Sequence, residues 1–213
     1  MSMLPFHLER EELHDLPGGG RVRFVPRYIK PEEADQQFDA CMTEIPWQDR
    51  DVIVFGRVLK QPRLTAWMAD EGCPYFYSQL LLEPLPWHPW VQALLPRIRK
   101  DTGFAMNSVL ANLYRDGNDG VGWHADDESC FPKWPPIVSL SLGETRRFQL
   151  RHRETKETWE WHLGHGDLLV MEGPVQRNHV HQVPRTKRAI GPRINFTFRP
   201  YQKAGAPPRE ALA

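Results

Sequence analysis

Two histidines and a carboxylate stand at a spacing that suits a metal ion. In GVGWHADDE, His124 and Asp126 are two residues apart, so on an extended segment both side chains leave the same face. A third ligand can come from another strand, since HVHQVP contains His179 and His181. Two histidines and one carboxylate on one side of a metal leave three positions open, an arrangement used with non-haem Fe(II), although zinc accepts the same ligands. The pattern predicts a metal centre without selecting the metal.

A second His-x-Asp pair has a different setting. His165 and Asp167 lie in HGD, a glycine-flanked turn that leads into the apolar run LLVME. We expect Asp167 to be a turn residue and His165 to be an exposed loop residue, with no part in a metal site.

The segment PRINFTFRP has one polar and one apolar face. The polar face carries Arg193, Asn195, Thr197 and Arg199. A half-buried strand with its polar face in water would show the same alternation. An iron centre that uses a chelating reductant offers another reading. The dicarboxylate 2-oxoglutarate requires cationic groups and hydrogen-bond donors at its two ends, and arginine binds a carboxylate bidentately. These residues, with Asn112 and Tyr114 on a facing strand, match that requirement.

Short strands dominate the part of the chain that positions these residues. We expect strands at 107–115, 136–142, 146–152, 158–163, 167–172, 179–184 and 193–199. Parallel crossovers need a dozen or more residues each, so this spacing predicts a mainly β sandwich or jelly roll of the α+β kind. Helices are expected at 30–45 and at about 88–101, the second ending at Gly103. Apart from the first helix, residues 1 to about 50 are expected to be irregular.

Length and composition indicate one intracellular domain. The chain of 213 residues has no run of eighteen apolar residues, and its N-terminus carries acids where a targeting peptide carries bases. Cys41, Cys73 and Cys130 fit neither a disulfide framework nor a zinc ribbon, so we expect buried or half-buried free thiols. We expect no membrane association and a monomer.

The neutral net charge hides a segregation of charges. Between Gly173 and Arg209 there is no Asp or Glu, whereas arginines and lysines are frequent. Such a segment indicates an anionic partner, of which nucleic acid is the commonest, although a solvated surface has the same composition.

Together these motifs resemble the AlkB family of Fe(II)- and 2-oxoglutarate-dependent nucleic-acid demethylases. The segments NLYRDGNDGVGWHADDE, SLSLGETRRFQLRH, LLVMEGPVQRNHVHQVP and PRINFTFR follow the family's order. VFGR (54–57) and QPRLTAW (61–67) are similar to segments that cover the substrate in the double-strand and single-strand repair members. The resemblance implies a double-stranded β-helix, with N-terminal helices and a substrate-covering lid over about 1–103, the jelly-roll core over about 104–200 and a tail at 201–213.

The resemblance also implies which residues hold the cofactors. His124, Asp126 and His181 would bind Fe(II), and His181 is preferred to His179 because the x-Val-Pro sequence follows it. Arg193 with Tyr114 would hold the distal carboxylate of 2-oxoglutarate. The end near the metal would be held by Arg199, Asn195 and Asn112. The third substrate of this chemistry is O2.

Substrate contacts follow from the same resemblance. Asp127 and Glu128 align with acids that contact the damaged base, and an acid suits a methylated base that is cationic near neutral pH. Further candidates for substrate contact are Phe55, Arg63, Tyr75 and Tyr77. The phenylalanine is either a wedge that fills the gap left by a flipped base or a core residue. The tyrosines either stack on the base or pack a sheet face, and Trp67 belongs to the core or to the lid.

The implied reaction is oxidative demethylation of 1-methyladenine and 3-methylcytosine, with release of formaldehyde, succinate and CO2. One alternative is an oxygenase of the same fold that acts on a protein or a small molecule. A second alternative is a nucleic-acid-binding module without catalysis. The sequence is compatible with DNA and with RNA as the substrate, and with a single strand as well as a duplex. We expect the protein in the cytoplasm of a bacterium, or in the nucleus if the source is eukaryotic.

Overall fold

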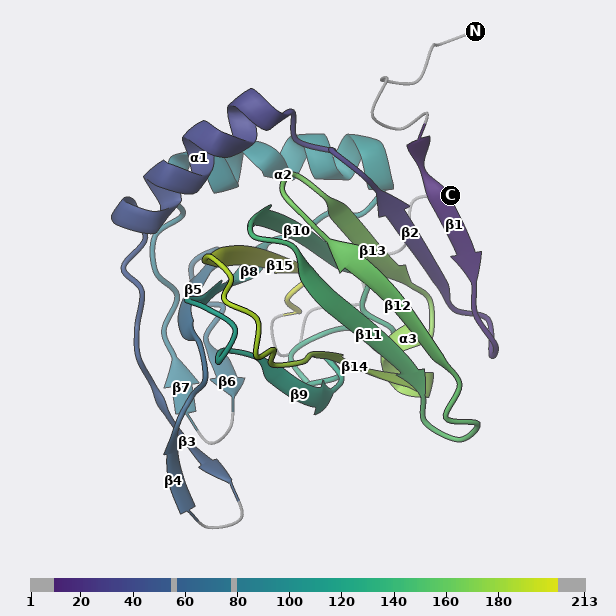
Figure 1. Cartoon of the computed structure of the whole chain (residues 1–213). Coiled ribbons are helices and arrows are strands. Elements are labelled where there is room, and N and C mark those ends of the chain that lie inside the picture. Colours follow the sequence, from purple (N-terminus) through teal and green to yellow (C-terminus); the bar gives the residue numbers. More distant parts are fainter. Residues whose placement is uncertain (1–9, 55–56, 78–79, 203–213) are drawn as a thin grey trace, which may run out of the picture.

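The computed structural model describes residues 10–54, 57–77 and 80–202, which form two facing sheets and three helices (Figure 1). The larger sheet has the strand order β1 (Glu12–Asp15), β2 (Arg21–Val25), β13 (Leu168–Glu172), β10 (Ile137–Gly143), β15 (Arg193–Arg199), β8 (Ser108–Tyr114) and β5 (Leu64–Ala69). The smaller sheet has the order β12 (Thr158–Leu163), β11 (Arg146–His152), β14 (His179–Val183) and β9 (Val121–His124). All strand pairs within these two sheets are antiparallel.

The two sheets enclose an apolar layer, as a jelly roll requires. Phe148, Leu150 and Trp161 of the smaller sheet are buried in one cluster with Ile137 and Met171 of the larger sheet. The predicted jelly-roll fold is thus confirmed, and the seven strands expected from the sequence are present within one residue of their predicted ends. Successive side chains of a strand point to opposite faces, so each sheet has one face in the apolar layer between the sheets and one face that points away from it.

Helices α1 (Pro31–Glu44) and α2 (Pro89–Thr102) cover the outer face of the larger sheet (Figure 1). Their buried residues, which include Cys41 and Leu94, join a second cluster with Ala111 and Phe196 of the sheet. Both helices begin at a proline, and α2 ends at Gly103, whose φ of +81° is the left-handed conformation that glycine adopts without strain. Both helices agree with their predicted positions.

The prediction that residues 1 to about 50 are irregular outside α1 is wrong. Strands β1 and β2 form a hairpin, and β2 pairs with β13 to extend the larger sheet. Each strand has at most five residues, which is too short for its alternation to be distinctive. The partner of β2 lies more than 140 residues away in the sequence, so its ladder is a product of the tertiary fold.

Two further hairpins lie at one end of the sheets. They are β3 (Asp51–Val54) with β4 (Arg57–Lys60) and β6 (Tyr75–Tyr77) with β7 (Leu80–Leu82), and Figure 1 shows them near β5 and β9. Trp67 of β5, Tyr75 of β6 and Phe131 form a third buried cluster. Trp67 is therefore a core residue, one of the two readings of the sequence.

The remaining structural expectations have mixed outcomes. The three cysteines are free thiols, with Cys41 and Cys73 buried and Cys130 half-buried, as predicted. Asp167 is a turn residue that accepts a hydrogen bond from the Gly164 N–H at 2.8 Å. His165 is not an exposed loop residue, because α1 packs over it; its Nδ1 accepts the Gly143 N–H at 2.7 Å. In the described part of the chain, no helix is long and apolar enough to cross a membrane.

Candidate metal and cosubstrate site

The structure brings His124, Asp126 and His181 together between the two sheets. Their ligand atoms lie within 4.8 Å of one another, so that among the described residues they form a group that could hold a metal ion. His124 ends β9 directly opposite His181 on β14, with 4.2 Å between the ring centroids. The Nδ1 of His124 lies 2.8 Å from the Gly122 carbonyl, which leaves Nε2 for a metal. His179, the rejected candidate, instead packs on Trp159.

The charge states of these residues suit a metal. Burial alone would raise the pKa of Asp126, but the charge of Arg199 outweighs it, and the pKa lies below its ordinary value. The Arg199 guanidinium places Nη2 2.8 Å from Oδ1 of Asp126 and Nε 3.2 Å from Oδ2. Burial and the neighbouring His124 lower the pKa of His181 to about 3. A carboxylate and a neutral imidazole are the forms that bind a metal.

Arg193 supplies buried and unpaired donors deeper in the same pocket. Arg193 is 1% exposed, and its Nη2 donates to the Ser141 hydroxyl at 2.8 Å. Nε and Nη1 are buried without a hydrogen-bond partner among the described residues. The Tyr114 ring lies 5.3 Å from the guanidinium carbon, as expected from the register of Arg193 opposite Tyr114. Burial lowers the pKa of Arg193 to about 10, so the group stays cationic at neutral pH.

Two asparagines face each other across β15 and β8 in the middle of the pocket. Asn195 and Asn112 are direct partners in the strand register. Asn195 Nδ2 donates to the Ser139 hydroxyl at 2.8 Å, and Asn112 Oδ1 accepts from Arg63 Nε at 2.7 Å. The pocket is lined by Arg63, Leu110, Asn112, Tyr114, Val121, His124, Asp126, Ile137, Ser139, Phe148, Met171, His181, Val183, Arg193, Asn195, Thr197 and Arg199.

These residues fit both a divalent metal and a dicarboxylate. The donor set of two imidazoles and one carboxylate is that of a non-haem Fe(II) centre. The two unpaired nitrogens of Arg193, Nε and Nη1, need an acceptor, because a buried charged donor without a partner is costly. A carboxylate in the pocket would supply such an acceptor through a charge-assisted hydrogen bond.

The acids predicted to contact the base lie in the segment that follows Asp126. The Asp127 side chain is 57% exposed and pairs with Arg153 Nη2 at 3.3 Å. Glu128 accepts a hydrogen bond from the Tyr75 hydroxyl, while its Oε2 is buried and has no hydrogen-bond partner in the described structure. Burial, together with the charge of Asp126, raises the pKa of Glu128.

The other predicted substrate residues differ in setting. Arg63 is buried in the wall of the pocket, where its Nε donates to Asn112 Oδ1. Tyr75 is fully buried and stacks on Trp67 at 4.5 Å, so a contact with a base stays a prediction. Phe55 lies outside the described residues, as does the side chain of Tyr77.

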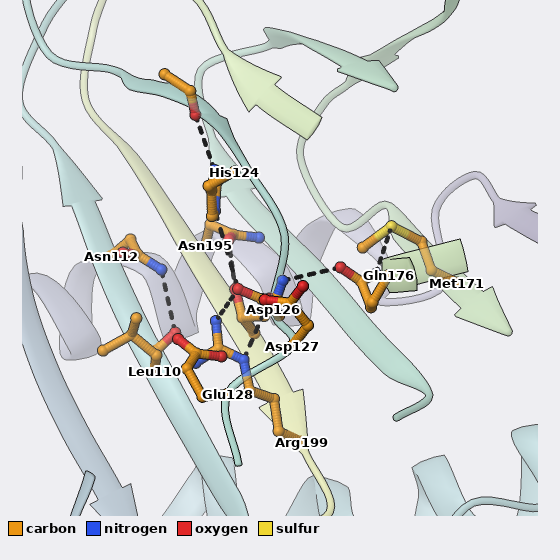
Figure 2. Close-up of polar contacts among 12 residues, drawn as sticks. Leu110, Asn112, His124, Asp126, Asp127, Glu128, Met171, Gln176, Asn195 and Arg199 are labelled. Atoms are coloured by element: carbon orange, nitrogen blue, oxygen red, sulfur yellow. Dashed lines mark hydrogen bonds and ion pairs between the residues drawn. The ribbon is translucent and has the colours of Figure 1, made fainter. Parts of the chain in front are cut away.

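Four polar residues that line the pocket or support the loops and side chains around it were not predicted. Ser139 and Ser141 alternate in PIVSLSL, and that alternation places both hydroxyls on one face, a signal available in the sequence. Gln176 had no such signal; its Oε1 accepts the Asp126 N–H at 3.0 Å (Figure 2). The buried Arg146, which donates to the carbonyls of Asp119 and Pro184, also lies in an ordinary strand pattern.

Comparisons with known proteins agree with this geometry. The model of the 2OG-Fe(II) oxygenase superfamily matches residues 21–199. The alpha-ketoglutarate-dependent dioxygenase alkB homolog 3 of Homo sapiens is 38% identical over 209 residues, which cover 92% of this chain and 72% of that protein. The DNA oxidative demethylase ALKBH2 of Mus musculus is 38% identical, over 90% of this chain and 95% of that protein.

A solved structure shows the same fold. OsALKBH1 matches with a TM-score of 0.60 and 20% identity, over 89% of this chain and all of that one. The solved structure shows the fold alone. The family model and the two relatives also show the family, because the model matches residues 21–199 and each relative is 38% identical over at least 90% of the chain. The protein therefore belongs to the AlkB family within the 2OG-Fe(II) oxygenase superfamily and is a dioxygenase that depends on Fe(II), 2-oxoglutarate and O2.

Proposed function

We propose that the protein oxidatively demethylates N-alkylated bases in DNA or RNA, with 1-methyladenine and 3-methylcytosine as substrates. The products would be the repaired base, formaldehyde, succinate and CO2. The observation that carries this proposal is the placing of the His124, Asp126 and His181 ligand atoms in one pocket with the unpaired nitrogens of Arg193. The name of the similar mouse protein, a DNA oxidative demethylase, supports the substrate class.

Each group of the pocket has a proposed task. His124, Asp126 and His181 would hold Fe(II), which with 2-oxoglutarate and O2 supplies the oxidising power that hydroxylates the N-methyl group. Arg193 and Tyr114 would bind the distal carboxylate of 2-oxoglutarate. The end near the metal would be held by Arg199, Asn195 and Asn112. Their burial excludes water and fixes the cosubstrate relative to the metal ligands.

The acids after the metal ligand favour a cationic base. The methylated bases carry a positive charge near neutral pH, whereas their normal counterparts are neutral. Asp127 is exposed beside the pocket, and Glu128 has one carboxylate oxygen without a hydrogen-bond partner among the described residues. A carboxylate there would bind the damaged base in preference to the normal one. A base in a duplex must leave the stack to reach the pocket, because its methyl group lies on the pairing edge.

The segment between Gly173 and Arg209, which has no Asp or Glu, supports an anionic substrate with only some of its cations. Arg193 and Arg199 point into the pocket and are buried, so they do not contribute to the surface. Exposed cations remain in the connection between β14 and β15, at Arg185, Lys187 and Arg188. Such cations attract the phosphates of a nucleic acid without reading its sequence.

Mass spectrometry of an oligonucleotide with one 1-methyladenine tests the proposal. The oligonucleotide is offered single-stranded and as a duplex, with Fe(II), ascorbate and the protein, with and without 2-oxoglutarate. We expect loss of the methyl group that requires 2-oxoglutarate. Succinate without demethylation on either substrate would contradict the proposed substrate and favour an oxygenase that acts on a protein or small molecule. Absence of both products would favour a binding module.

The strand preference has its own test. If Phe55 is a wedge, Phe55→Ala lowers duplex repair more than single-strand repair. Equal effects on both substrates would favour a core role for this residue.

We further propose that the protein is a monomer and that residues 1–213 form one domain. Light scattering coupled to size exclusion tests the first statement, with the mass of one 24.8 kDa chain as the expected result. A single cooperative unfolding transition is the expected result for the second. The cytoplasmic location stays a prediction from the sequence.

A further inference from the structure

We propose that Gln176 is a positioning residue for the metal centre, and that it acts by fixing the backbone of Asp126. Gln176 lies in α3 (Val175–Asn178), the short helix that joins β13 to β14. Its side chain points at the segment that carries the carboxylate ligand (Figure 2). The proposal rests on the assignment of His124, Asp126 and His181 as the metal ligands.

The contact between Gln176 and Asp126 is buried and specific. The Gln176 Oε1 accepts the Asp126 backbone N–H at 3.0 Å, and the two residues are each 2% exposed. The amide is oriented at its other end, where Nε2 lies 3.4 Å from the Met171 Sδ (Figure 2). Since Asp126 follows the end of β9, no strand ladder holds its N–H, and a buried N–H without an acceptor is costly. Gln176 therefore supplies the acceptor that a sheet supplies elsewhere.

A second contact ties the next residue to the same helix. Arg153 Nη2 lies 3.3 Å from the Asp127 carboxylate and 3.4 Å from the Gln176 carbonyl. Residues 126 and 127 are thus connected to α3 once through a buried side chain and once through a half-exposed arginine. These two contacts limit the directions in which the Asp126 carboxylate can point.

The helix that provides these contacts is itself held in place. Asn178 Nδ2 donates to the Gly18 carbonyl at 3.3 Å, and the Arg153 N–H donates to the Asn178 carbonyl at 2.8 Å. Val175 packs so closely on the β1–β2 turn that a Cβ on Gly20 would lie 2.7 Å from its Cγ2. The chain then continues from α3 into β14, which carries His181. One short element thereby sets the position of two of the three ligands.

The consequence concerns metal affinity. A partner that orients a metal ligand affects affinity by about 10- to 100-fold when it is removed. We expect loss of the Gln176 acceptor to weaken metal binding by about ten-fold, because the Asp126 backbone is then free to move out of position. A purely structural role would lower the stability of the fold and leave the affinity of the folded protein unchanged.

The test is titration of the full chain with Mn(II) alone, by calorimetry, at a temperature where every variant is folded. Gln176→Met has a similar length and lacks the acceptor, whereas Gln176→Glu keeps an acceptor oxygen toward the Asp126 N–H. Gln149→Met is the matched control, since Gln149 bonds only to Glu160 and Gln182 among the described contacts, on the smaller sheet. If Gln176→Met does not fold, Gln176→Asn replaces it, because its amide is one methylene too short.

The expected result is a Mn(II) dissociation constant about ten-fold higher for Gln176→Met and within two-fold of the wild type for Gln149→Met. Gln176→Glu is expected to bind at least as tightly as the wild type. Wild-type Mn(II) affinity in Gln176→Met would overturn the positioning role and leave the metal centre intact. Equal losses of Mn(II) affinity in Gln176→Met and Gln176→Glu would also overturn it, because the acceptor oxygen would then make no difference. Failure of the wild type to bind Mn(II) would overturn the metal centre itself and the positioning role with it.

Discussion

Arg199 and Asp126 form a buried ion pair in which a proposed cosubstrate residue binds a proposed metal ligand. Nη2 of Arg199 lies 2.8 Å from the carboxylate, and both side chains are 3% exposed. Burial lowers the pKa of Arg199, but the charge of Asp126 outweighs it and raises the pKa above its ordinary value. The third guanidinium nitrogen, Nη1, is buried and has no partner in the described structure. Arg199 therefore stabilises the charged form of Asp126 and keeps a donor for a further acceptor.

Replacement of Arg199 by Met is expected to destabilise the metal-free protein by about 3–5 kcal/mol, because it leaves a buried carboxylate without its partner. Urea unfolding measures this loss. Mn(II) should restore more stability to the variant than to the wild type, since the cation compensates the orphaned charge. Arg147→Met, at an exposed position on β11, is the control and should change stability by less than about 0.5 kcal/mol. Equal stability of the two variants would show that the pair contributes nothing.

The alternation of the strands made much of the site predictable. In β15 and β8 the polar positions share a face, and antiparallel pairing then places Arg193 opposite Tyr114 and Asn195 opposite Asn112. A period of two is a local property, so it can be read without knowing the partner strand. The same alternation in 136–142 places the hydroxyls of Ser139 and Ser141 on the face of Asn195 and Arg193.

Other parts depended on contacts that no local pattern encodes. Strand β2 exists because β13 offers a free edge, and β5 pairs with β8 although it was not predicted as a strand. The ion pair of Arg199 with Asp126 joins residues 73 positions apart. Both residues are predictable as site residues from their motifs, but no local pattern pairs them with each other. Gln176 was missed for the same reason.

Asp126→Ala is expected to reduce demethylation to background, because it removes the only carboxylate among the three proposed ligands of the described site. Mn(II) titration should show loss of binding in parallel. Circular dichroism checks that the fold persists, since the substitution also leaves Arg199 without its partner. Demethylation at the wild-type rate in a folded variant would contradict the assignment of the site.

Ser141→Ala is expected to raise the KM for 2-oxoglutarate about five-fold with little change in kcat. The hydroxyl accepts a hydrogen bond from Arg193 Nη2, and one hydrogen bond contributes about 1 kcal/mol. An interaction that orients the cosubstrate equally in the ground and transition states affects KM alone. Steady-state kinetics with varied 2-oxoglutarate measures both constants. Arg193→Met, which removes the cation itself, should have a much larger effect; a Ser141→Ala variant with unchanged KM would show that Arg193 needs no orientation.

Asp119→Asn is expected to destabilise the fold in a pH-dependent way. The Asp119 carboxylate, 5% exposed, accepts three hydrogen bonds from Arg115 in the loop before β9, at 2.8 to 2.9 Å. Burial by itself raises the pKa of Asp119, but the bonds and charge of Arg115 outweigh it, and the pKa lies below its ordinary value of 3.8.

A carboxyl with a lowered pKa in the folded state stabilises the fold above its ordinary pKa and loses that contribution as the pH falls through the lowered value. The variant should therefore lose about 2 kcal/mol at pH 7. The difference from the wild type should shrink as the pH falls below about 4. Chemical denaturation at several pH values measures the difference, and Glu157→Gln, at an exposed turn, is the control. A constant difference down to pH 2 would contradict an ionic role, because a protonated Asp119 would then be as useful to the loop that leads to His124 as a charged one.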